Sequence, residues 1–84
     1  KSVRILDTFY NNQEYETCVQ ISDIILIQDP LGEEVLKFKL KSLTLLGREP
    51  EAKKEFNSFR RGFKRRYKEE FSKNFGEFIE SKND

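Results

Sequence analysis

The residues that could support catalysis are few and lie far apart in the sequence. The chain has one cysteine, Cys18, and no histidine. Neither a Cys/His zinc site nor a Cys–His nucleophile can therefore be assembled within it. The carboxylate pairs Glu33–Glu34 and Glu69–Glu70 fall at expected helix ends, where no pocket surrounds them, and the four glycines are isolated, which gives no phosphate-binding loop. We expect no enzyme activity, no metal, no cofactor and no small-molecule ligand.

Positive charge is concentrated in one segment. From Arg48 to Lys68 there are nine basic residues against three acidic ones, whereas the flanking parts are net negative. Such a basic helix can follow a phosphate backbone by charge attraction, bind an acidic protein, or form a solvated face that neutralises nearby acids. The sequence leaves these three readings open. The candidate basic strip consists of Arg61, Lys64, Arg65 and Lys68.

Length and composition predict a single small domain. The chain has 84 residues, a net charge of +1 and eleven aromatic residues, which supply much of the expected core. No run approaches the roughly 20 apolar residues of a membrane helix, and no secretory signal is recognisable. One cysteine fits a reducing compartment. We expect a cytoplasmic fragment of a longer protein that does not contact a membrane.

Apolar residues three and four apart predict four helices, over residues 2–11, 14–28, 32–46 and 50–71. Asn11-Asn12, Asp29-Pro30 and Gly47 mark the turns, since these residue types favour left-handed or non-helical backbone. The Ile24–Ile27 run could be misread as a strand, but its spacing continues that of a helix. A shorter turn is expected after Asn74, followed by a frayed end.

The same pattern recurs after 34 residues. Leu6 and Cys18 are matched by Leu40 and Ala52. A period of this length built from two helices is typical of helical-hairpin repeats, which stack to bury what one hairpin cannot. We therefore predict an all-α fold of two antiparallel hairpins stacked as tetratricopeptide-like repeats, with a long fourth helix. Residues 1–73 would form this domain, and 74–84 a short extension in which Phe75, Phe78 and Ile79 fold back over the fourth helix.

Three stretches between Tyr15 and Phe71 carry a family resemblance: EYETCVQISDIILIQDPLGEE, LKSLTLLGREPEAKKEF and FRRGFKRRYKEEF. In order and spacing they resemble the bacterial transcriptional activator domain, a branch of the tetratricopeptide-like repeats. Cys18 stands where that family usually has Ala, and Gly62 where it has a helix former. The resemblance implies a module for assembly or regulation, with DNA read by a separate domain of the same regulator.

The function predicted from these observations is protein–protein interaction or self-association within a bacterial transcription regulator. Two alternatives remain open: nucleic-acid contact through the basic fourth helix, and a generic repeat scaffold unrelated to transcription. The partner would be a second copy or another regulator subunit. The candidate partner face lies on the first and third helices and consists of Asp7, Tyr10, Lys37, Phe38 and Lys41.

Overall fold

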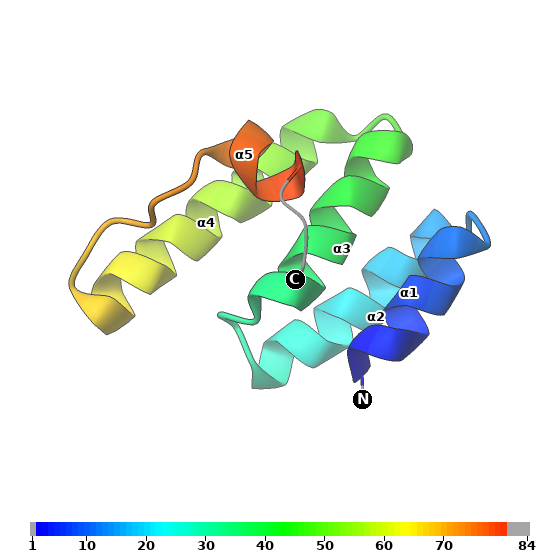
Figure 1. The fold of residues 1–84 in the computed structure, drawn as a ribbon, viewed down its shortest axis with the longest axis horizontal. Coiled ribbons are helices and arrows are strands. Elements are labelled where there is room, and N and C mark those ends of the chain that lie inside the picture. Colours follow the sequence, from blue (N-terminus) through cyan, green and yellow to red (C-terminus); the bar gives the residue numbers. More distant parts are fainter. Residues whose placement is uncertain (1, 81–84) are drawn as a thin grey trace.

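The computed structural model describes residues 2–80, and all its regular elements are helices (Figure 1). Consecutive helices are joined by short turns, except that a longer irregular segment, 68–74, precedes the last helix. The Ile24–Ile27 run is helical, as predicted. The elements are α1 (Ser2–Asn11), α2 (Tyr15–Gln28), α3 (Glu33–Leu45), α4 (Glu49–Tyr67) and α5 (Phe75–Glu80).

The first hairpin is formed by α1 and α2. Leu6 and Cys18 are fully buried in one cluster with Val35 of α3. The Cys18 thiol lies 3.8 Å from the Leu6 carbonyl oxygen, so the small side chain permits close approach of the two helices. The left-handed residue between them is Gln13 (φ 63°), rather than an asparagine as the sequence suggested. Its position lets the Glu14 amide donate to the Phe9 carbonyl at 2.9 Å.

The second hairpin is formed by α3 and α4. Gly47, at φ 78°, follows the end of α3 and is one of the positions where glycine avoids a steric penalty. The Arg48 amide donates to the Leu43 carbonyl across this turn at 2.8 Å. Pro50 lies in the first turn of α4, where its missing amide proton costs nothing. Leu40 and Phe56 share one buried cluster, as expected.

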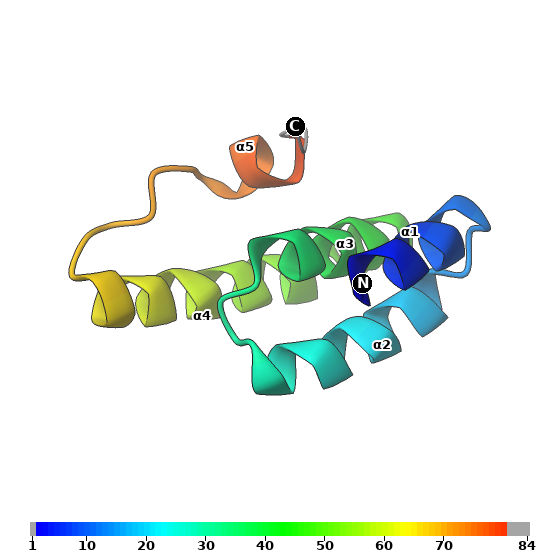
Figure 2. The same ribbon diagram turned by 60° about the horizontal axis from the view of Figure 1, so that its bottom comes forward.

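Helix α3 is the centre of the molecule. It packs against α1, α2, α4 and α5. Figure 2 shows α5 on one side of α3 and α4, with α2 on the other. Residues 34 positions apart have the same burial in the two hairpins: Leu6 and Leu40 are fully buried, and so are Cys18 and Ala52.

Helix α4 ends four residues earlier than predicted. Lys68 adopts a left-handed conformation (φ 64°) and its amide donates to the Lys64 carbonyl. The expected helix to Phe71 is therefore wrong. The reversal brings Phe71 back onto α4, with its ring centroid 5.0 Å from those of both Phe59 and Phe63. Burying this ring against the aromatic row gives a reason for the chain to leave the helix.

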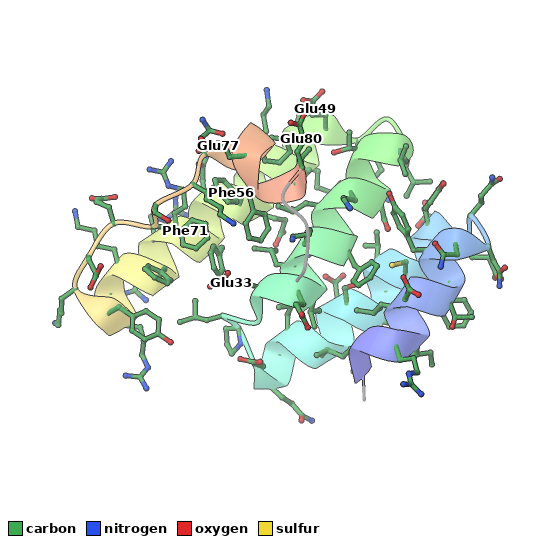
Figure 3. All side chains as sticks on the ribbon, in the orientation of Figure 1. Glu33, Glu49, Phe56, Phe71, Glu77 and Glu80 are labelled. Carbon is green, nitrogen blue, oxygen red and sulfur yellow. The ribbon has the colours of Figure 1, made fainter. Side chains whose placement is uncertain are left out.

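Helix α5 covers the same aromatic row. Asn74 and Glu77 form a reciprocal cap: the Glu77 amide donates to Asn74 Oδ1 at 2.8 Å, and the Asn74 amide to Glu77 Oε1 at 3.0 Å. Phe78 is 1% exposed and its ring centroid lies 5.3 Å from that of Phe56. Figure 3 shows Phe56 and Phe71 together on the side of α4 that α5 covers. The predicted fold-back is confirmed, while the frayed end expected at 81–84 lies outside the described residues.

Candidate functional site

Four of the five residues predicted for the partner face lie near one another on α1 and α3. The Tyr10 and Phe38 rings meet edge to face with centroids 5.8 Å apart, and Lys41 Nζ lies 5.8 Å from the Tyr10 centroid. Burial raises the pKa of the Tyr10 hydroxyl. Asp7 is exposed and accepts a hydrogen bond from Asn11. Tyr10, Phe38 and Lys41 are half-buried, so this part of the face is partly accessible.

Lys37 does not share that accessibility. It is 7% exposed, and its Nζ lies 6.0 Å from the ring centroid of Phe78 on α5. Burial lowers the pKa of Lys37, and the positive charge of nearby Lys41 adds to this effect. The terminal extension therefore covers one end of the predicted face, which the spacing on α3 alone could not indicate.

The predicted basic strip divides into residues with different partners. Lys64 Nζ pairs with Glu70 at 2.8 Å, and this hydrogen bond lowers the pKa of the Glu70 carboxyl. Arg61 and Arg65 line a cleft between α4 and the end of α2, and Arg61 also lines a separate hollow with Lys64 and Glu70. Lys68 forms the left-handed end of the helix. Neutralisation of nearby acids thus accounts for Lys64 but not for the two arginines.

A buried lysine joins three helices, and sequence reasoning did not single it out. Lys39 on α3 is 6% exposed and pairs with Asp23 of α2 and, at 3.1 Å, with Glu55 of α4. Burial opposes its charge, but the hydrogen bonds to the two carboxylates outweigh that effect and raise the pKa of Lys39. The only sequence signal was a charged residue within the apolar pattern of α3.

The two ends of the helical stack differ in how they are covered. The capped end is the aromatic face of α4 beneath Phe71 and α5. The open end is the face of α1 and α2 that carries Ile5 and Ile24, which are 47% and 63% exposed. At about 100° of helical rotation per residue, Ile24 lies about 160° around α2 from the fully buried Ser22, and Ile5 about 140° around α1 from Tyr10, which contacts Phe38 of α3. Both isoleucines therefore point away from α3. Ile27, 79% exposed, neighbours Ile24 on α2.

A metal site and a reactive thiolate each require particular side chains in a suitable environment. Between residues 2 and 80, no group of three His, Cys, Asp or Glu side chains is arranged to hold a metal ion. Burial raises the pKa of the Cys18 thiol, which disfavours the reactive thiolate. None of the helices in this range is long and apolar enough to cross a membrane.

Comparison with known proteins adds no relative. No family model, no curated protein and no solved structure matches this chain. A functional proposal must therefore rest on the sequence and on the surfaces described above.

Proposed function

We propose that this chain is a protein-interaction module made of stacked tetratricopeptide-like hairpins. The relation between successive hairpins supports this. Arg48 pairs with Glu16 at 3.3 Å near the start of α4 and α2, and Glu55 and Asp23 share Lys39 further along the same two helices. Helices α2 and α4 thus run side by side in the same direction. This is the arrangement that a repeated hairpin produces.

Helix α5 continues the stacking of successive hairpins. Helix α3 packs on both helices of the first hairpin. Helix α5 packs on α3 and, through Phe78, on the Phe56 and Phe59 rings of α4. It therefore occupies the place that the first helix of a third repeat would take. Repeat proteins need such a capping element, because a stack otherwise ends in an apolar face.

The observation that carries the proposal is the difference between the two ends. One end is capped, while Ile5, Ile24 and Ile27 remain exposed at the other. Fully burying one isoleucine side chain contributes about 1.5–3 kcal/mol. An apolar face of this kind marks an interaction site when its side chains are contiguous. We propose that another protein surface, a second copy in the simplest case, covers the open end.

The regulatory context comes from the sequence resemblance. We propose that the module belongs to a cytoplasmic bacterial transcription regulator and serves its assembly, with DNA bound by a different domain. The motifs between Tyr15 and Phe71 support this. The sequence that precedes Lys1 in the parent gene tests it: a winged-helix or receiver-type domain agrees with the proposal, whereas a long array of further 34-residue repeats contradicts it.

Sedimentation equilibrium tests the interaction directly. The chain should associate reversibly with rising concentration, and Ile24→Lys should shift it to monomer. Leu45→Lys is the matched control, because Leu45 is also exposed, at 54%, but lies on α3 near the other hairpin turn. Equal effects of both variants would indicate non-specific association through exposed apolar side chains. A monomer at every concentration would exclude self-association and restrict the proposal to a different protein partner.

A further inference from the structure

A groove runs along α4 between that helix and α2. Its inner part, about 440 Å³, is lined by the end of α2, the α2–α3 turn and the middle of α4. A second hollow continues it toward Pro50 and shares Glu55, Ser58 and Arg61 with the first. From Pro50 to Arg65 the groove follows α4 for about 22 Å, at 1.5 Å per residue. This length fits an elongated segment of about 15 residues better than a compact ligand.

The inner part of the groove has an apolar floor, whereas the second hollow is lined mainly by charged and polar side chains. Leu26 of α2, Leu31 of the turn and Phe59 of α4 line the inner part. Gly62 also lines it, and a Cβ atom placed there would lie 3.5 Å from Leu31. The missing side chain therefore leaves room between the turn and α4. Such a floor accepts apolar side chains that recur on one face of a helix.

The charges on the rim are unbalanced because its acids are already paired. Glu55 pairs with Lys39, and Glu51 pairs with Arg48 at 2.9 Å. Arg61 and Arg65 are exposed and have no ion-pair partner among the described residues. They lie four residues apart, so their guanidinium groups project from neighbouring positions of one helix face. Lys54 of the second hollow is likewise exposed and unpaired among the described residues, so the groove offers three available cations.

We infer that this groove binds an acidic amphipathic helix of a partner protein. Apolar side chains of that helix would enter between Leu26 and Phe59, and its carboxylates would accept hydrogen bonds from Arg61 and Arg65. Guanidinium groups suit this task because they bind carboxylates in a bidentate way. The inference rests on the proposed function and adds to it a second surface, distinct from the open end, with the chemistry of its occupant.

Fluorescence anisotropy with defined probes tests the inference. The first probe is a fluorescein-labelled amphipathic peptide of about 18 residues, five turns of helix, with leucines on one face and glutamates on the other. A second peptide carries glutamine in place of every glutamate, and the third probe is a mixed-sequence DNA duplex. The glutamate peptide should bind at low salt and weaken as salt rises. The affinity of the glutamine peptide should be lower by a factor of roughly ten or more.

Three variants locate the binding. Arg61→Glu with Arg65→Glu should reduce affinity for the glutamate peptide roughly tenfold or more, since both attractive charges become repulsive. Lys53→Glu with Lys64→Glu is the matched control, with the same change in net charge about a quarter turn around α4 from the two arginines and outside the groove lining. It should have less than about a threefold effect, since binding is local. Ser58→Trp leaves the charges unchanged and should block the groove, because Ser58 lines both hollows. Circular dichroism checks that each variant remains helical.

Each outcome decides between explanations. Equal losses in the two charge variants, or no loss in Ser58→Trp, would overturn the groove as the binding site. DNA binding that exceeds peptide binding and depends on Arg61 and Arg65 would replace the inference with nucleic-acid contact. Peptide binding that is absent while Ile24→Lys still disrupts self-association would overturn this inference alone. If the peptide binds a chain that does not self-associate, the groove inference stands and self-association through the open end is overturned.

Discussion

The capped and open ends of the stack are built from similar helices, but only the capped end has its apolar face covered by a further part of the described chain. At the capped end, the chain leaves α4 at Lys68, returns through Phe71 and places α5 over the aromatic row. At the open end, Ile5 and Ile24 face outward with nothing from residues 2–80 over them. A helical repeat always presents an apolar face at its edge, so the comparison shows which edge this chain covers itself. The other edge is the one available to a partner.

Removing Phe56 gives the largest effect and tests the capped end. Its ring lies within 6.4 Å, centroid to centroid, of the rings of Phe59, Phe71, Phe75 and Phe78. Phe56→Ala should lower the free energy of unfolding by about 3–5 kcal/mol, from lost burial and the cavity left behind. Urea denaturation measures this. Ile24→Ala at the open end should stay within about 0.5 kcal/mol, and equal losses would abolish the distinction between the ends.

Lys39 tests whether the two hairpins are held together by the buried ion pairs. Lys39→Ala leaves Asp23 and Glu55 without their shared cation and should cost about 1–3 kcal/mol in urea denaturation. Lys53→Ala breaks an exposed pair with Glu49 and a cation–π contact with Phe75 at 6.0 Å, and should cost less than about 1 kcal/mol. Because the pKa of Lys39 is raised above 10.5, its contribution is complete below that pH and disappears as pH rises through the raised value. A Lys39→Ala loss no larger than that of Lys53→Ala would contradict the role.

Gly62→Ala should stabilise the chain. An alanine Cβ would lie 3.5 Å from Leu31, an ordinary van der Waals distance, and alanine favours the helix by about 1 kcal/mol. The thermal midpoint should therefore rise. Gly47→Ala is the contrasting variant, because its φ of 78° is unfavourable for a side chain, and its midpoint should fall. A lower midpoint for Gly62→Ala would mean that the groove beside α4 is narrower than described.

The smallest effect concerns Glu70, which ties the segment before α5 to α4. The pKa of its carboxyl lies below the ordinary 4.5 because Lys64 hydrogen-bonds to it. Since the folded-state pKa is the lower one, the stabilisation is present above the unfolded value and is lost as pH falls through the folded value. Carboxyl NMR titration should show the depressed pKa, and Lys64→Gln should raise it. An unchanged value in Lys64→Gln would show that the pair does not form in solution.

Local patterns predicted the helices well, and long-range contacts explain what they missed. The spacing of Leu36, Leu40 and Leu43 and the turn at Gly47 depend on neighbouring residues, so their helix and its end were predictable. The end of α4 was not, because Phe71 gains more from rings beneath it than from another helical turn. Lys37 was placed on the candidate partner face and Lys39 was not singled out. The burial of both depends on α2, α4 and α5, which are distant in sequence.

The candidate surfaces also depend partly on local sequence and partly on long-range contacts. The spacing of Arg61 and Arg65 placed them on one helix face, but which cations remain available was decided by partners such as Glu70 and Lys39. The apolar run at Ile24–Ile27 was visible in the sequence. Its exposed side depends on which side of α2 is buried, and that side is marked by Ser22, which is fully buried in the folded chain. The partner face and the regulatory role stay predictions.

The brevity of α5 has a consequence for assembly. Its six residues lie at the end of an irregular segment and are held chiefly by Phe78 and its neighbouring rings. A copy in which this short helix swings away would present apolar surfaces at both edges. Because those edges are different, such copies would join head to tail, and an unclosed series of that kind grows into a fibre. If the chain self-associates as proposed, the last helix would prevent the growth of such a polymer.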